Sequence, residues 1–125
     1  MKSIVTLTLN PAVDKSSSVN SVASEIKLRC SAPRFDPGGG GINVSRAIHK
    51  LGGDSLAIYA GGGSTAHMLH SLLEEEGVRQ QIVPITGRTR ENFVVYEETS
   101  GLQYRFGMPG PVMSPAEWQR CIDII

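Results

Sequence analysis

A run of four glycines directly ahead of a helical pattern constrains this chain more than any other feature. Gly38, Gly39, Gly40 and Gly41 stand in the stretch FDPGGGGINVSRAIHKLGG. Glycine loses more backbone freedom on folding than any other residue, so a folded domain keeps such a run where a Cβ would collide or where φ is positive. The run indicates either a tight strand-to-helix crossover or a loop that cradles a ligand, and its own residues leave both interpretations open.

Two polar residues near the glycine run favour the interpretation that it cradles a ligand. Asn43 stands in the first helical turn, where unpaired backbone N–H groups and the helix dipole attract an anion or a hydroxyl. Its amide donates and accepts hydrogen bonds, as a sugar hydroxyl does. Asp14 is predicted at the carboxyl end of the first strand, where open α/β sheets bind ligands; the alternative for Asp14 is a turn or cap residue. The glycine run Gly38–Gly41 and the residues after it match neither a P-loop nor a GxGxxG motif.

Strands and helices alternate along the chain. Short apolar runs predict strands at 4–9, 55–60 and 80–86, and Pro84 favours an edge or irregular position for the third. An amphipathic helix is predicted between the first two strands and another at 65–76. The apolar face predicted for the first helix consists of Val44, Ala47, Ile48 and Leu51. Parallel strands joined by helices predict an open α/β sheet.

Four other segments predict an antiparallel appendage to this sheet. The serine-rich residues 16–24 indicate a linker or a weak exposed strand, and 27–35 alternates apolar and polar residues as a strand with one open face does. Residues 92–98 and 103–108 flank the turn sequence TSG and predict a β-hairpin.

The last segment predicts a helix with a strong start and no stop. Ser114 and Glu117 have capping-box spacing, with Pro115 at the first helical position. The apolar face of this helix is predicted to consist of Trp118, Cys121, Ile122 and Ile125. The sequence ends on that face without a glycine or a basic last turn, which favours the N-terminal part of a longer protein over a natural short one.

Composition excludes several classes of protein. The 12 basic and 12 acidic residues give a net charge of zero, so nothing electrostatic favours nucleic acid or a membrane surface as a partner. The apolar N-terminal run is short and broken by threonines, which predicts a buried strand rather than a signal peptide. Cys30 and Cys121 have no metal-type or CxxC spacing and are predicted to be ordinary thiols of a cytoplasmic protein.

Four stretches together resemble the N-terminal half of the ribokinase-type carbohydrate kinases: TLTLNPAVD, KLRCSAPRFDPGGGGINVSRAIHKLGG, AIYAGGG and GLQYRFGMPG. The resemblance covers essentially the whole chain in one register. It implies an α/β fold, the N-terminal part of a three-layer sandwich with a mostly parallel sheet and an antiparallel β lid from about 16–35 and 92–107. Residues 1–125 would then be the N-terminal portion of a single kinase domain whose C-terminal catalytic and ATP-binding half is absent.

The resemblance also implies roles for particular residues. The carboxylate of Asp14 is expected to bind sugar hydroxyls, and Gly38–Gly41 with Asn43 to line the sugar. The stretch Thr89–Asn92 is similar to a family motif that places an arginine, here Arg90, near the sugar phosphate. A guanidinium fork suits phosphate oxygens. Lys27 and Arg29 are expected on the lid sheet, reaching the active site of the neighbouring subunit.

The catalytic base of the family lies in a Gly-Ala-Gly-Asp motif, which this sequence lacks, so the base is expected downstream of Ile125 and no catalytic residue within the chain. Other members of the group have lysine inside the glycine run, whereas position 40 is glycine, as in the family's 6-phosphofructokinases.

The implied activity is MgATP-dependent phosphorylation of fructose 6-phosphate to fructose 1,6-bisphosphate by a homodimer joined through the lid, with ATP and Mg²⁺ held mostly outside this chain. The alternatives are 1-phosphofructokinase or tagatose-6-phosphate kinase activity, a kinase for an unphosphorylated sugar or nucleoside, or a non-catalytic fragment that only binds sugar phosphate or self-associates. The 125 residues alone are expected to be inactive.

Overall fold

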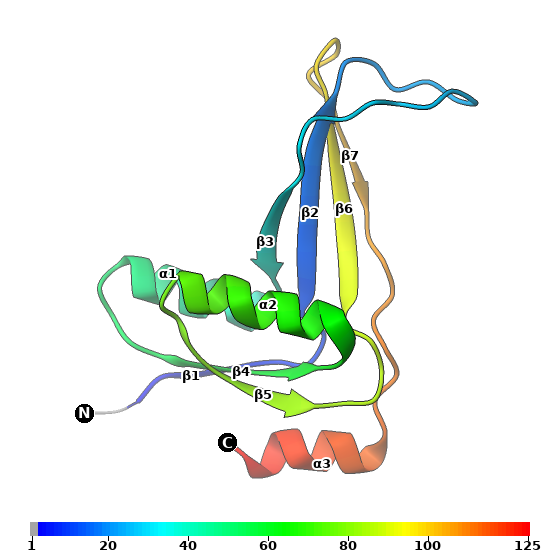
Figure 1. The fold of residues 1–125 in the computed structure, drawn as a ribbon. Coiled ribbons are helices and arrows are strands. Elements are labelled where there is room, and N and C mark those ends of the chain that lie inside the picture. Colours follow the sequence, from blue (N-terminus) through cyan, green and yellow to red (C-terminus); the bar gives the residue numbers. More distant parts are fainter. Residues whose placement is uncertain (1–2) are drawn as a thin grey trace.

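The computed structural model describes residues 3–125 and contains two sheets (Figure 1). The first sheet is parallel, with strand order β1-β4-β5. Its strands are β1 (Val5–Thr8), β4 (Leu56–Gly61) and β5 (Arg79–Pro84). This confirms the three predicted strands, because each observed end lies within two residues of its predicted position. β5 is the edge strand that Pro84 predicted.

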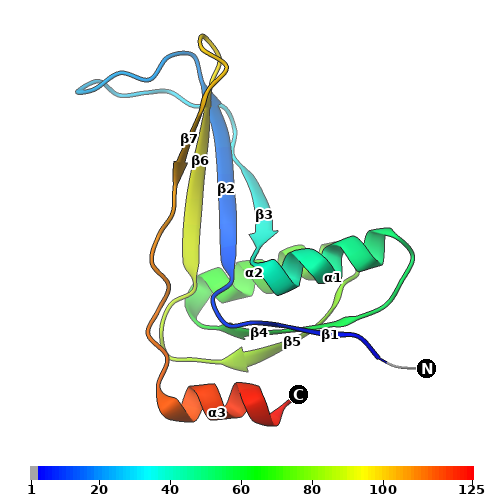
Figure 2. The ribbon, with the colours of Figure 1, turned by 180° about the vertical axis from the view of Figure 1, so that it is seen from behind.

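Helices cover both faces of the parallel sheet. Helices α1 (Gly40–Lys50) and α2 (Gly63–Glu75) lie on one face and α3 (Pro115–Asp123) on the other, as Figures 1 and 2 show from opposite sides. The α2 side of the core is built on apolar residues from β4 and α2, and the α3 side on residues from β4, β5 and Cys121. The chain is therefore the three-layer α/β arrangement that was expected.

The second sheet stands upright on this layer (Figure 1) and is called the lid sheet here. Its strand order is β3-β2-β6-β7. The strands are β2 (Ala12–Val19), β3 (Arg34–Gly38), β6 (Arg90–Glu97) and β7 (Gln103–Phe106). The hairpin β6–β7 is antiparallel as predicted, but β2 and β6 run parallel, so the lid is mixed rather than antiparallel. Val13 and Phe35 join its base to the core beneath α2.

The lid departs from two predictions. Of the two interpretations of residues 16–24, the strand holds for 16–19, which end β2, and the linker for 20–24. The serines at 16–18 are half-buried because all three pair with β6 and Ser16 also pairs with β3. The strand predicted at 27–35 begins only at Arg34. Residues 20–33 instead form a long connection between β2 and β3, called the lid loop here.

Helix α1 differs from its prediction in both start and buried face. It begins at Gly40, so the last two glycines of the run are helical. Its buried residues are Ile42 and Ser45, whereas Val44 is 51% and Leu51 88% exposed. Ser45 is tolerated inside because its hydroxyl bonds to those of Thr6 (2.7 Å) and Ser55 (2.9 Å). Helix α1 ends before Gly52, at φ 85°, as predicted.

Helix α3 is capped as predicted. The Ser114 hydroxyl accepts from the Glu117 N–H, and the Glu117 carboxylate accepts from the backbone N–H groups of Ser114 (2.8 Å) and Thr86 (2.7 Å). These donors hold the pKa of Glu117 below its ordinary value. Of the predicted apolar face, Cys121 is fully buried, which raises the pKa of its thiol, while the other members remain exposed: Trp118, Ile122 and Ile125.

Both cysteines carry free thiols. Among residues 3–125, no helix combines the length and the apolar character that crossing a bilayer requires.

Candidate active site

One face of the lid sheet gathers most of the predicted site residues. Residues that pair across strands share a face. Asp14 pairs with Asp36 of β3 on one side and with Asn92 of β6 on the other. Two residues toward the base of the lid, on the same face, Ala12 lies between Gly38 and Arg90. The start of the glycine run, the carboxylate and the arginine therefore lie at the same end of one face.

Asp14 lies inside β2, and its predicted position at the end of the first strand is wrong. The chain turns after β1 at Asn10 and Pro11 and enters β2 at Ala12, so the carboxylate is carried by a central lid strand. Asp14 keeps its neighbourhood with the glycine run because β2 pairs with β3, which leads directly into that run.

Asn92 fixes the Asp14 carboxylate. Its side-chain amide donates to Oδ1 of Asp14 at 3.2 Å, and its amide oxygen accepts the N–H of Met108 at 2.9 Å. One side chain therefore ties the carboxylate to the segment that leaves β7. Oδ2 of Asp14 takes no part in the bond to Asn92, so it stays available to hydroxyl groups of a ligand.

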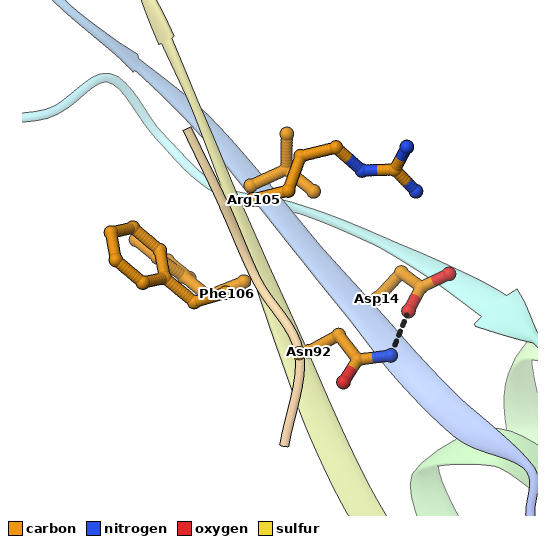
Figure 3. Close-up of a pocket in the computed structure, with 7 residues that line it drawn as sticks. Asp14, Asn92, Arg105 and Phe106 are labelled. Carbon is orange, nitrogen blue, oxygen red and sulfur yellow. Dashed lines mark hydrogen bonds between the residues drawn. The ribbon is translucent and has the colours of Figure 1, made fainter. Parts of the chain in front are cut away.

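A hollow of about 150 Å³ adjoins this pair. Its lining residues are Asp14, Asn92, Phe93, Val94, Arg105, Phe106 and Gly107. Figure 3 shows Asp14 and Arg105 extending to one side of the strands and Phe106 to the other. Arg105 pairs with Val94 and so shares the face of Asp14 and Asn92. A carboxylate, an amide and a guanidinium converge there.

The four positions of the run differ in why glycine occupies them. A Cβ at Gly38 would lie 2.6 Å from Oδ2 of Asp14, and one at Gly41 would lie 2.6 Å from the Thr8 hydroxyl. Gly39 has φ 126°, which L-residues rarely adopt. A Cβ at Gly40 meets no atom within 4 Å among the described residues. Three glycines therefore serve the crossover, and Gly40 leaves open space at the helix start.

Thr8 sets the start of α1. Its hydroxyl accepts the N–H of Ile42 at 3.0 Å and so caps the helix in place of Gly39, which has no side chain. Gly39 contributes its carbonyl, which accepts the N–H of Asn43 at 2.8 Å. The Asn43 side chain is exposed in the first turn, beside the open space at Gly40. Close backbone approach and a free amide are thus available together.

Arg90 is held in place by main-chain oxygens. Its guanidinium donates to the carbonyls of Met108 (3.1 Å) and Asn10 (3.2 Å), while its Nε is buried without a hydrogen-bond partner in the described part of the chain. A buried donor normally has a partner. Arg88, two residues earlier, instead bonds to the hydroxyls of Ser64 and Thr65 and points elsewhere.

Lys27 and Arg29 are not brought to the other site residues. Both are exposed on the lid loop, so their predicted place on the lid sheet is wrong. The loop begins after Val19, five positions along β2 from Asp14. That separation is about 17 Å at about 3.3 Å per residue. Within one chain, these two cations project from the far end of the lid.

Sequence reasoning missed Arg105 as a site residue and gave Asn92 no role of its own. The bonded pair of Asp14 and Asn92 is separated by 78 residues, so only the pairing of β2 with β6 reveals it. The available signal was the hairpin. Once β6–β7 is in register, Arg105 falls on the same face as Asn92.

Three comparisons with known proteins bear on this site. The profile of the pfkB family carbohydrate kinases matches residues 3–122. The ATP-dependent 6-phosphofructokinase isozyme 2 of Mycobacterium tuberculosis is 51% identical over 120 residues, which is 96% of this chain and 35% of that protein. The 1-phosphofructokinase of Xanthomonas campestris is 29% identical over 119 residues, covering 95% of this chain and 37% of that protein.

A solved structure gives the same result. The crystal structure of phosphofructokinase-2 from Escherichia coli in complex with fructose-6-phosphate matches with a TM-score of 0.93 and 46% identity, over 99% of this chain and 41% of that one. The chain thus spans between 35% and 41% of the length of these three relatives. Fold and sequence agree over nearly all of its residues, and the chain belongs to the pfkB family of carbohydrate kinases.

Proposed function

We propose that the protein carrying this chain transfers a phosphoryl group from MgATP to fructose 6-phosphate, forming fructose 1,6-bisphosphate in the cytoplasm, and that residues 1–125 supply the acceptor-binding half of the site. The observation that carries this proposal is the shared face of the lid sheet, where Asp14, Asn92 and Arg90 lie beside the glycine run. The similarity to 6-phosphofructokinases at 46–51% identity supports the choice of substrate.

Each residue has a separate task in this proposal. Asp14, oriented by Asn92, accepts hydrogen bonds from sugar hydroxyls, and Arg90 binds the acceptor phosphate through its guanidinium. Gly40 and Asn43 let the sugar approach the start of α1. Together they hold one hydroxyl in line with the phosphoryl donor, which is the main protein contribution to phosphoryl transfer.

ATP is the family's phosphoryl donor, and MgATP supplies the transferred group when it is bound. No group of three or more His, Cys, Asp or Glu within residues 3–125 is arranged to hold a metal ion. We place the residues for ATP and Mg²⁺, and the catalytic base, mostly in the part of the kinase that this chain does not span. Asp14 is therefore not assigned the role of base.

Replacing Asp14 by alanine tests the assignment. Asp14→Ala is expected to raise KM for fructose 6-phosphate and to lower kcat, reducing kcat/KM by roughly tenfold to 150-fold. That range corresponds to the ~1.5–3 kcal/mol of hydrogen bonds to a charged group. A coupled ADP-release assay with MgATP measures it in the protein that carries this chain. Asp54→Ala is the control, because that carboxylate is exposed and pairs with Arg79.

Wild-type kinetics for Asp14→Ala would contradict the assignment. The same assay compares fructose 6-phosphate with fructose 1-phosphate and tagatose 6-phosphate, and a higher kcat/KM for either of these would replace the proposed substrate. Residues 1–125 expressed alone are expected to show no turnover. If residues 1–125 alone do show turnover, and Asp14→Ala abolishes it, the half-site proposal is contradicted, because a catalytic base would then lie within the chain.

We also propose that two copies of the protein associate through the lid. The face opposite Asp14 is apolar and surrounds a hollow of about 270 Å³. Its lining residues are Val19, Val22, Leu28, Cys30, Phe93, Val95, Tyr104 and Phe106. Such a patch favours burial against a partner, and the Escherichia coli relative has been solved as a tetrameric inhibited form. The second copy would bring its Lys27 and Arg29 to the neighbouring site.

A charge on the apolar face tests this association. Phe106 is 50% exposed, and Phe106→Asp is expected to weaken the dimer by roughly tenfold or more, because burying such a side chain contributes ~1.5–3 kcal/mol. Light scattering over a concentration series measures the change in dimer stability. Gln103→Asp, on the opposite face of β7, is the matched control. A Phe106→Asp protein with unchanged dimer stability would rule out this face.

A further inference from the structure

The lid loop, residues 20–33, is attached to the lid sheet at both of its ends. Near its start, the N–H of Val22 donates to Oε2 of Glu97 at 2.5 Å. The N–H of Thr99 donates to the carbonyl of Asn20 at 3.1 Å, and the Ser21 and Thr99 hydroxyls lie 3.2 Å apart. The start of the loop is therefore fixed to the tip of the β6–β7 hairpin.

The end of the loop is fixed to β2. The Ser31 N–H donates to the carbonyl of Ser18 at 2.9 Å, and the Ser31 hydroxyl accepts the N–H of Ser18 at 3.0 Å. The hydroxyl of Ser17 donates to the Ser31 carbonyl at 2.7 Å. This second attachment uses only neutral groups.

The segment between the two attachments carries the cations. Residues 23–30 are exposed except for Leu28, which is half-buried, and they include Lys27 and Arg29. Neither cation forms an ion pair with any described residue of its own chain. Figure 1 shows the lid loop extending sideways from the top of the lid. The direction in which it projects is therefore set by its two attachments.

Glu97 is the one charged group in those attachments. It is 8% exposed, and its second oxygen accepts from the Ser100 hydroxyl, which itself accepts the N–H of Leu102 at 3.2 Å. Both donors are neutral, and they hold the pKa of Glu97 below its ordinary value. Hydrogen bonds to a carboxylate are roughly twice as strong as neutral ones. A buried carboxylate with no ion-pair partner among residues 3–125 thus binds the hairpin turn and the start of the loop together.

We propose that Glu97 is a positioning residue: it fixes the start of the lid loop so that Lys27 and Arg29 reach the acceptor phosphate in the neighbouring subunit. This inference rests on the proposed function, because it acts through the role given there to the two cations. It adds a residue that does not line the acceptor hollow. Glu97 lies five positions along β6 from Asn92, on the face of Phe93 and Val95, where it borders the apolar lining through Val22.

Hydrogen exchange tests the attachment itself, independently of activity. In Glu97→Ala, the amide of Val22 is expected to exchange roughly tenfold faster or more, since a hydrogen bond to a charged group is lost. Amides of β2 and β6 that pair with each other report whether the lid sheet stays folded. Ser100→Ala removes only one of the two donors and provides a milder variant should Glu97→Ala fail to fold.

Two comparisons separate positioning from general stability. Glu98 is the adjacent, exposed carboxylate, and Glu98→Ala is expected to leave both exchange and kinetics unchanged. Glu97→Gln is expected to restore most of the protection. Its amide oxygen can accept the Val22 N–H, and the Ser100 hydroxyl can turn round and accept from the amide nitrogen.

Steady-state kinetics test whether Glu97 affects binding of fructose 6-phosphate through Lys27 and Arg29. Glu97→Ala is expected to raise KM for fructose 6-phosphate roughly fivefold to tenfold, while KM for ATP and kcat change less than twofold. In a Lys27→Ala/Arg29→Ala background, the same substitution is expected to have no further effect on KM, because residues that act through one another are not additive.

Additive effects on KM, or slow Val22 exchange in Glu97→Ala, would overturn the role of Glu97. If Lys27→Ala/Arg29→Ala leaves KM for fructose 6-phosphate unchanged, the role proposed for those cations fails, and the inference fails with it. Loss of activity in Asp14→Ala would still support the acceptor site in that case. The two proposals can therefore fail separately.

Discussion

Arg90→Ala is expected to weaken binding of fructose 6-phosphate by about 2–4 kcal/mol, a roughly 30-fold to 1,000-fold rise in Kd, the range for truncating one partner of a buried charge pair. The carbonyls of Asn10 and Met108 hold the guanidinium, and its Nε lacks a partner among the described residues. Arg90 as a whole is half-buried, and each terminal nitrogen keeps a second N–H that a phosphate oxygen would accept. Calorimetric titration of the protein with fructose 6-phosphate measures the change.

Two further variants make the Arg90 result specific. Arg88→Ala, which removes a guanidinium bound to serine and threonine hydroxyls, is expected to change the Kd less than threefold. Arg90→Lys keeps the charge but not the fork, so an intermediate loss is expected. ATP binding measured without sugar should be unaffected by Arg90→Ala. If ATP binding falls as much as sugar binding, Arg90 does not act on the acceptor phosphate.

The parallel layer of the fold could be predicted because its signals are local. β4 is an uninterrupted apolar run that pairs on both sides, and its six residues are buried or nearly so. α2 has its apolar side chains at helical spacing, with Leu69 and Leu73 fully buried, and it ends before Gly77, at φ 77°. β4 and α2 bury residues that their own sequence patterns select, whereas α1 buries Ile42 and Ser45 in place of its predicted face.

The lid could not be predicted in the same way, because distant pairings decide it. Polar residues 15–18 lie inside β2: all four pair with β6, Lys15 and Ser16 also pair with β3, and Ser31 of the lid loop bonds to the backbone of Ser18. β-propensity is weak beside such pairing. The alternation at 27–35 is typical of a strand, yet 27–33 lies in the lid loop, where Ser31 bonds to Ser17 and Ser18.

The candidate site divides along the same line. The glycine run could be singled out from the sequence because four consecutive glycines are costly to fold. Asp14 could be singled out only from its predicted position after the first strand, which is wrong, and from the family resemblance. Asn92 and Arg105 are ordinary residues of a hairpin until β2, β6 and β7 are in register. Only then do an amide and a second guanidinium join the carboxylate.

The glycine run offers the other large effect, a contrast between two adjacent residues. Gly39→Ala is expected to lower the free energy of unfolding by about 2–6 kcal/mol. A backbone at φ 126° strains an L-residue by ~1–3 kcal/mol, and the new Cβ would lie 2.7 Å from Cγ2 of Thr8, adding an overpacking cost of ~1–3 kcal/mol. Urea denaturation measures this loss against the wild type.

Gly40→Ala is the matched control and the test of the ligand at once. Its Cβ meets no described atom within 4 Å, and its place in α1 favours alanine, so the free energy of unfolding should stay equal or rise by ~0.4–1 kcal/mol. If the open space belongs to the sugar, this stable variant should nevertheless bind fructose 6-phosphate more weakly. Equal destabilisation by both substitutions would contradict the division of the run into crossover glycines and one ligand-facing glycine. Unchanged sugar binding in Gly40→Ala would return Gly40 to the crossover interpretation alone.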